Sequence, residues 1–101
     1  MSKVRVDVVS AFAEALGIPS TSEEVIPEHD GGSDQSVMAF LERLAVRYQY
    51  FGDTVFDSNT QKLTGGVMIF HNGRDLELLD GLETKLSDGD TLTFVPVIPG
   101  G

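Results

Sequence analysis

The first residues of the chain alternate between valine and charged side chains. Valines occupy positions 4, 6 and 8, with lysine, arginine and aspartate between them. A period of two residues is typical of a strand with one buried face, so we predict a first strand from Lys3 to Val9. The segment 11–16 has a short helical or turn pattern that ends at Gly17, and 23–27 is a second, weaker strand. Pro27 predicts that this second strand either ends there or lies at a sheet edge.

The middle of the chain changes to a helical pattern. Apolar residues recur at three- and four-residue spacing and predict one long helix over residues 34–50, with Ser33 or Asp34 as its cap. The repeat consists of Val37, Leu41, Leu44, Ala45 and Tyr48. Residues 51–66 are polar and rich in turn-forming residues, which predicts a long loop with a short strand pairing around residues 54–56.

The last third of the chain returns to strand patterns. Residues 67–70 form a continuous apolar run that Asn72-Gly73 closes, as in a buried central strand. After short elements and a turn at Asp88-Gly89, Leu92 and Phe94 alternate with threonines in a final strand. Two strands, a helix and further strands predict an α+β fold, with a mixed sheet and one main helix packed on one face. The β-grasp (ubiquitin-like) fold meets this description, with a single domain over 1–95 and a flexible tail over 96–101.

Composition excludes several classes of function. The chain has 101 residues, 16 acidic against 7 basic and a net charge of −9, without a basic cluster, so direct nucleic-acid binding is not expected. The absence of cysteine excludes a disulfide scaffold, a thiol nucleophile and a thiolate zinc site. We find no signal peptide and no apolar stretch long enough to span a membrane, which predicts a cytoplasmic protein without membrane contact.

Few side chains are arranged for catalysis or metal binding. Glu28, His29 and Asp30 are adjacent on a predicted loop, where they would rarely converge on one ion, so we predict no metal site. His71 is interpreted as an edge-strand residue next to a turn, and Asp88 with Asp90 as a solvated acidic pair. The glycines form no nucleotide-binding motif, so no cofactor is expected on this chain. We predict that the chain itself has no catalytic residue and is not an enzyme.

The most reactive group is expected at the C-terminus. The chain ends at Gly100-Gly101 directly after the final strand, and two glycines make a thin tail that can enter a narrow active site. A terminal carboxylate has a pKa of roughly 3.3–3.7, so it is ionised at neutral pH and can attack the α-phosphate of ATP within an activating enzyme. A sulfur nucleophile can then displace AMP from the acyl-adenylate. In this scheme ATP binds the partner.

The segment from Gly66 to Gly101 resembles the ubiquitin-like sulfur carriers, namely the molybdopterin synthase small subunit (MoaD) and the ubiquitin-related modifier. The resemblance lies in the apolar strand with its Asn-Gly turn, the run Leu76-Glu-Leu-Leu-Asp-Gly-Leu, the turn at Asp88-Gly89, the last strand and the diglycine. It implies that Gly101 is adenylated and converted to a thiocarboxylate, while Gly100 keeps the tail slim. It also implies partner contacts by the residues before the diglycine, namely Val95, Pro96, Val97, Ile98 and Pro99.

The resemblance leaves the acceptor open. One hypothesis is sulfur donation for molybdopterin (molybdenum cofactor) biosynthesis, with an adenylating enzyme and the molybdopterin synthase large subunit or another sulfur acceptor as partners. The alternative is a protein modifier that forms isopeptide bonds with target lysines and also serves tRNA thiolation. A third hypothesis is a binding module whose diglycine is never activated. Pro99 departs from the typical tails of both branches, and residues 51–66 are longer than a minimal molybdopterin-type subunit needs, which favours the modifier branch.

Overall fold

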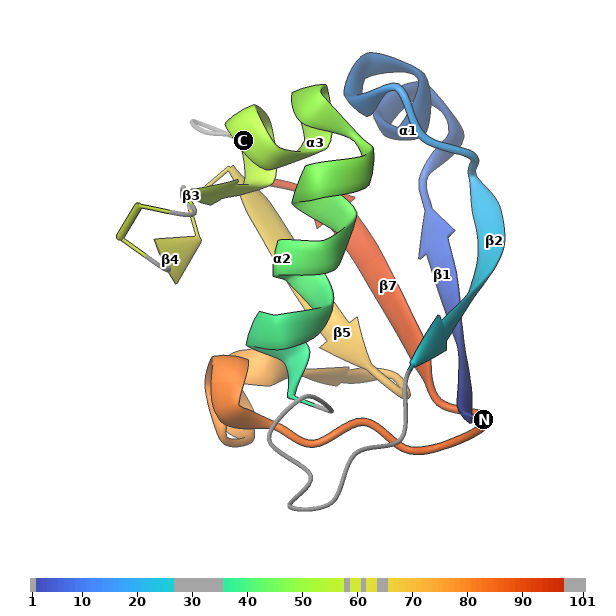
Figure 1. The fold of residues 1–101 in the computed structure, drawn as a ribbon, viewed down its shortest axis with the longest axis vertical. Coiled ribbons are helices and arrows are strands. Elements are labelled where there is room, and N and C mark those ends of the chain that lie inside the picture. The colour runs from blue at the N-terminus through green and yellow to red at the C-terminus, as the bar shows by residue number, and fades with distance from the viewer. Residues whose placement is uncertain (1, 27–35, 58, 61, 64–65, 98–101) are drawn as a thin grey trace.

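The computed structural model describes residues 2–26, 36–57, 59–60, 62–63 and 66–97 (Figure 1). Its main sheet has five strands in the order β2-β1-β7-β5-β6. β1 pairs antiparallel with β2 and parallel with β7, and β5 pairs antiparallel with both β7 and β6. The strands are β1 (Ser2–Val8), β2 (Thr21–Ile26), β5 (Val67–His71), β6 (Arg74–Asp75) and β7 (Thr91–Pro96). The predicted α+β, β-grasp architecture is confirmed.

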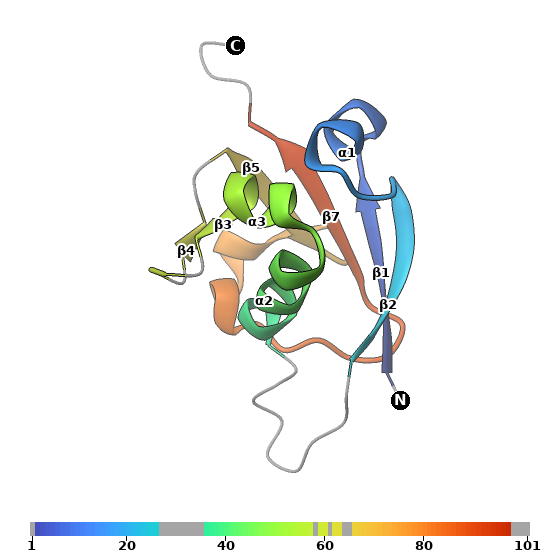
Figure 2. The same cartoon turned by 45° about the horizontal axis from the view of Figure 1, so that its top comes forward.

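The helices lie on one face of this sheet (Figures 1 and 2). The main helix is α2 (Val37–Arg47). Of the helix and the turn predicted for residues 11–16, the structure has a helix, α1 (Ser10–Leu16), which ends at Gly17 as expected; Gly17 has the left-handed conformation. The cap of α2 is Ser36, whose hydroxyl accepts a hydrogen bond from the Ala39 N–H at 3.2 Å. The expected caps Ser33 and Asp34, like Pro27 and the stretch 28–30, lie outside the described residues.

The prediction of one helix followed by a long loop was wrong. At Tyr48 the backbone is extended, with φ −127° and ψ 101°, and a second helix, α3 (Gln49–Val55), begins directly after it. Phe51 and Val55 repeat at helical spacing and are fully buried. Gly52 misled the prediction because glycine favours turns, but here a Cβ would lie 3.0 Å from the Ala45 Cβ, so its absence allows α2 and α3 to approach closely.

A short strand pairing follows α3, close to where it was expected. β3 (Phe56–Asp57) pairs antiparallel with β4 (Lys62–Leu63). Two single 3₁₀ turns, η2 (Leu76–Leu78) and η3 (Gly81–Glu83), follow β6. The described part of the segment 51–66 is therefore mostly ordered into helix and strand.

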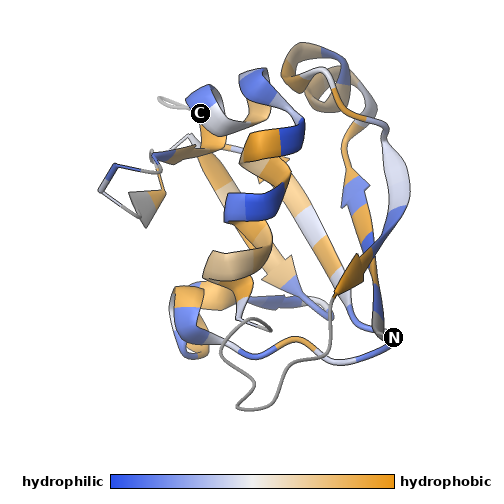
Figure 3. Cartoon of the chain, viewed as in Figure 1, coloured by the Kyte–Doolittle hydropathy of each residue, from blue (hydrophilic) through white to orange (hydrophobic). Residues whose placement is uncertain are grey.

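The core lies between the sheet and its helices. Leu92 and Phe94 are fully buried, as predicted, and the Phe94 ring meets the Phe51 ring of α3 edge-to-face, with centroids 5.4 Å apart. Hydrophobic residues dominate β5 and alternate with polar ones along β1 (Figure 3). β5 was expected to be buried on both faces, but Met68 is 39% exposed because the helices cover only one face. His71 was interpreted as an edge-strand residue, but it belongs to β5, which lies between β7 and β6 and is not at the sheet edge.

Candidate functional site at the end of the last strand

The predicted site residues fall into two groups. Val95 and Pro96 belong to β7, and Val97 follows it; Pro96, assigned to the tail from sequence, pairs with Val67. The Val97 N–H donates to the carbonyl oxygen of Gly66, the residue before β5, at 3.1 Å. This hydrogen bond extends the pairing between β7 and β5 to Val97. The other predicted residues, Ile98, Pro99, Gly100 and Gly101, lie outside the described residues.

An apolar row crosses three strands at this end of the sheet, on the face away from the helices. Met68 of β5 is the register partner of Val95 of β7. Val8 of β1 pairs with Phe94, so the next residue, Val9, lies beside Val95. The residues before these three are buried on the helix side, and side chains alternate along a strand, so Val9, Val95 and Met68 share the open face.

Val97 extends this row toward the tail, because it is two residues beyond Val95. Val9 is 50% exposed, Val97 41%, and Val95 is half-buried. We call Val9, Met68, Val95 and Val97 the apolar patch. Exposed valines and methionine that cluster where a chain end leaves the sheet form a surface suited to a protein partner.

On β7 and β1 the rest of the open face is polar, so on these two strands the apolar patch is confined to the tail end. Thr91 and Thr93 occupy the same face of β7, and Arg5 donates to the Asp7 carboxylate at 2.9 Å on β1. An exposed pair of this kind contributes little to stability. A partner that binds the apolar patch would therefore meet a charged border on the β1 side.

Of the residues in the apolar patch, the sequence prediction included Val95 and Val97 but not Val9 or Met68. The signal for Val9 is that it follows a strictly alternating strand, at the position where the next charged residue would stand. Met68 was hidden in the continuous apolar run 67–70, which shows no alternation that would separate an open from a buried face. Only the sheet order places Val9 and Met68 beside β7.

A hydrogen-bonded network lies at the opposite end of β7. The Asp90 carboxylate accepts from His71 Nε2 at 2.8 Å, from the Ser87 N–H at 2.8 Å and from Asn72 Nδ2 at 3.1 Å. Asn72 Oδ1 in turn accepts from the Thr91 N–H at 2.8 Å. Burial raises the pKa of Asp90, but these hydrogen bonds and the charge of His71 outweigh burial and hold the pKa below its ordinary value.

This network corrects the interpretation of Asp90 as a solvated residue. Its side chain is only 16% exposed, and that of His71 is 14% exposed. Asp88, by contrast, is exposed, and its carboxylate accepts from the Lys3 N–H at 2.8 Å. The network joins the β5–β6 turn to the start of β7, so its role is structural and it does not touch the apolar patch.

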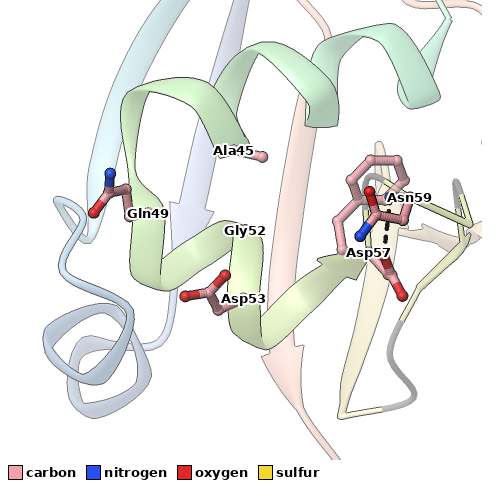
Figure 4. Close-up of a pocket in the computed structure, with 7 residues that line it drawn as sticks. Ala45, Gln49, Gly52, Asp53, Asp57 and Asn59 are labelled. Carbon is pink, nitrogen blue, oxygen red and sulfur yellow. Dashed lines mark hydrogen bonds between the residues drawn. The ribbon is translucent and has the colours of Figure 1, made fainter.

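A polar hollow beside the helices also has a structural explanation. It has a volume of about 510 Å³ between α2, α3 and β3 (Figure 4). Its lining residues are Ala45, Gln49, Gly52, Asp53, Phe56, Asp57 and Asn59. The Asp57 carboxylate accepts from the Asn59 N–H at 2.9 Å, which closes the turn between β3 and β4.

Within the described ranges, no three histidine or acidic side chains are grouped to hold a metal ion. None of the helices in the same ranges combines the length and the apolar character needed to cross a bilayer. Among the described residues, the apolar patch therefore remains as the candidate site, because it lies at the end of β7, next to the predicted reactive tail.

Comparison with known proteins shows the family of the chain. The ThiS family model matches residues 9–101. The sulfur carrier protein CysO of Mycobacterium tuberculosis is 30% identical over 84 residues, which cover 76% of this chain and 90% of the relative. The structure of small archaeal modifier protein 1 from Methanosarcina acetivorans superposes with a TM-score of 0.75 at 27% identity, over 100% of this chain and 98% of that one.

A chain of the BexX/CysO complex from Amycolatopsis orientalis is also similar, with a TM-score of 0.68 at 23% identity, over 97% of this chain and 99% of that one. This likeness shows the fold alone. The fold, the family model and these relatives identify a β-grasp protein of the sulfur carrier and ubiquitin-like modifier class. The chain belongs to the ThiS family.

Proposed function

We propose that this protein is a sulfur carrier whose C-terminal Gly101 is adenylated by a partner enzyme and converted to a thiocarboxylate. The Gly101 carboxylate attacks the α-phosphate of ATP, and pyrophosphate leaves. A sulfur nucleophile on the partner then attacks the acyl carbon, and AMP leaves. Where this nucleophile is the terminal sulfur of a partner persulfide, the product is an acyl disulfide. A second partner thiol then attacks the inner sulfur and breaks the S–S bond, so the outer sulfur stays on Gly101 as a thiocarboxylate and the two partner sulfurs are left oxidised as a disulfide. Because activation consumes ATP, the proposal places the protein in the cytoplasm.

The observation that carries this proposal is the apolar patch at the base of the predicted tail. An activating enzyme must hold the domain while the last residues enter its active site. The apolar patch lies where β7 ends, and the Val97–Gly66 hydrogen bond fixes the exit direction of the backbone. The chain supplies the carboxylate and the docking surface, while the partner supplies ATP binding and catalysis, so we propose no enzymatic activity for the chain itself.

For the acceptor, we propose the molybdopterin synthase large subunit, on the basis of the sequence resemblance over 66–101. The second candidate function is a protein modifier conjugated to lysines through Gly101, which the 27% identity to small archaeal modifier protein 1 favours. Intact mass of the protein from its native cells tests the two together. One sulfur in place of one oxygen at Gly101 supports the carrier, and a ladder of adducts lost on deletion of Gly101 supports the modifier.

The docking surface can be tested with a matched pair of variants. Val9→Asp puts a charge in the apolar patch. Val25→Asp puts the same charge on the same open face of the sheet but on β2, outside the apolar patch, at a valine that is 46% exposed. Val9 is the N-cap residue of α1, where aspartate is favourable, so the fold should persist. We expect Val9→Asp to slow ATP–pyrophosphate exchange with the activating enzyme about 10- to 100-fold. Equal rates for both variants would refute docking through the apolar patch.

A further inference from the structure

The two edges of the sheet differ in length. β6 forms one edge and contains only two residues, whereas β2 forms the other and contains six. Long open edges are places where another strand can pair, and proteins usually shorten or cover them. Figure 2 shows β2 at the outer border of the sheet, with β1 on its inner side. β2 is therefore the edge at which strand addition is geometrically possible.

The hydrogen-bond directions of β2 identify which backbone groups face outward. The Val8 N–H of β1 donates to the Ser20 carbonyl oxygen at 2.8 Å, so Ser20 faces β1. Backbone groups alternate in direction along an antiparallel pair, so Ser22, Glu24 and Ile26 also face β1. Thr21, Glu23 and Val25 then present their N–H and C=O groups at the open edge. Among the described residues, no backbone-to-backbone hydrogen bond reaches these groups from outside the β1–β2 pair.

A groove runs beside this edge, between β2 and α2. It has a volume of about 170 Å³, with the buried Phe40 and Leu44 of α2 on one side and β2 at Val25 on the other. The Val25 side chain itself points to the open face of the sheet. Its remaining lining residues are Glu24, Arg43 and Arg47. A strand added to β2 would point every second side chain toward this groove.

The charged residues that line the groove are two arginines of α2 and one glutamate of β2, so its lining is net positive in a chain that is strongly acidic. The chain carries −9 overall and has only seven basic residues, yet Arg43 and Arg47 both lie here. Arg43 Cζ lies 6.0 Å from the centre of the Phe40 ring, and Arg47 Cζ lies 5.6 Å from that of Tyr48. Arg47 also pairs with Glu24 at 2.5 Å. These contacts hold both guanidinium groups in place before any ligand arrives.

We propose that the open edge of β2 binds an extended segment of a partner protein as an added strand. The backbone of the segment pairs with Thr21, Glu23 and Val25. An apolar side chain of the segment enters the groove beside Phe40 and Leu44, and an acidic side chain meets the guanidinium groups. This surface is separate from the apolar patch and does not depend on activation of Gly101.

The alternative occupant, a second copy of this chain, is disfavoured by charge. Antiparallel pairing of two β2 edges about their central outward residue would place Glu23 directly opposite Glu23. Like charges directly opposite each other destabilise a strand pair, and each copy carries −9. A partner segment with acidic and apolar residues instead complements the two arginines.

The probe for this proposal is a short peptide with blocked ends. Threonine occupies every second position. The positions between the threonines hold isoleucine at the centre of the peptide and aspartate toward both ends. Added to the ¹⁵N-labelled full-length protein, it should shift the amide signals of Thr21, Glu23 and Val25 and the side-chain signals of Arg43 and Arg47. Arg47→Gln should weaken binding about two- to five-fold, because its side chain is 61% exposed. The same peptide with lysines in place of aspartates should bind more weakly still.

The decisive variant is Glu23→Pro, with Glu23→Ala as its matched control. Proline removes the outward N–H but leaves the bonds to β1 intact, so it should abolish binding that the alanine variant retains. Should the proline variant fail to fold, the wild-type protein is tested instead with a peptide whose backbone N–H groups that would face β2 are N-methylated. This peptide should not bind. Shifts confined to other surfaces, no shifts at all, or a Glu23-dependent dimer in sedimentation of the protein alone would each overturn the proposal.

Discussion

The Asp90 network allows one stability prediction to be worked out from its contacts. Asp90→Asn keeps the size of the side chain and removes its charge. One carboxylate oxygen accepts from both His71 and Ser87, and the other accepts from Asn72. An asparagine can present an oxygen to only one side. Asn72 cannot rotate to compensate, because its own oxygen already accepts from the Thr91 N–H.

Either orientation of the new amide therefore loses at least one hydrogen bond and places two donors face to face. Hydrogen bonds to a charged group contribute about 1.5–3 kcal/mol each, and the Asp90 side chain is mostly buried. We expect Asp90→Asn to lower the free energy of unfolding by about 1–3 kcal/mol at neutral pH. For a domain of this size, each kcal/mol corresponds to a fall in Tm of about 4–8 °C.

The pH dependence of this loss follows from the lowered pKa of Asp90. A depressed pKa in the folded state contributes stability above the unfolded pKa, roughly 3.9, and this contribution disappears as pH falls through the folded pKa. The gap between wild type and Asp90→Asn should begin to narrow as pH falls below about 4 and disappear below the folded pKa.

Urea unfolding followed by far-ultraviolet circular dichroism measures this gap, since the chain has no tryptophan. Asp53→Asn is the control, because it makes the same charge change at an exposed position of α3. The reasoning is refuted if Asp90→Asn and Asp53→Asn have equal effects at neutral pH, or if the gap is unchanged at acidic pH. Activation of Gly101 should be unaffected in the folded variant, because the network lies at the other end of β7.

Three further predictions concern the core and can be checked with the same unfolding assay. Phe94→Ala should cost about 3–5 kcal/mol, because it opens a cavity against Phe51. Thr84→Val should be neutral or raise stability by up to about 1 kcal/mol, since the buried Thr84 hydroxyl has no hydrogen-bond partner among the described residues. Gly52→Val should cost about 1–3 kcal/mol, because its Cβ would meet Ala45 at 3.0 Å, and replacing Ala45 by glycine as well should recover part of that loss.

Where one physical signal dominated a segment, its structure could be predicted from the sequence. The alternating valines of β1, the alternating Leu92 and Phe94 of β7 and the apolar repeat of α2 each reflect burial on one face. The Asn72-Gly73 turn was predictable because Asn72 must adopt a positive φ, here 53°, and Gly73 one of 84°. These elements, with their order, were enough to indicate the β-grasp fold.

The failures occurred where local and tertiary signals conflict. Gly52 and Asp53 resemble turn residues, yet they lie in α3, because burial of Phe51 and Val55 outweighs their low helix propensity. The exposure of Met68 depends on which face of the sheet the helices cover, and local sequence does not determine this. The proximity of His71 to Asp90 likewise follows from the pairing of β5 with β7.

Strand β7 connects the features on which the proposals rest. Its start is held by the Asp90 network, its middle is anchored by Phe94 against α3, and its end carries the apolar patch. Sulfur transfer and conjugation both begin with the same activated terminus, so the apolar patch alone does not distinguish their acceptors. We infer that discrimination between acceptors requires contacts away from β7, and the open edge of β2 is such a surface. A Glu23→Pro variant that is activated normally but no longer delivers sulfur or forms adducts would connect the two surfaces. Normal delivery to both acceptors would show that the β2 edge has a separate role.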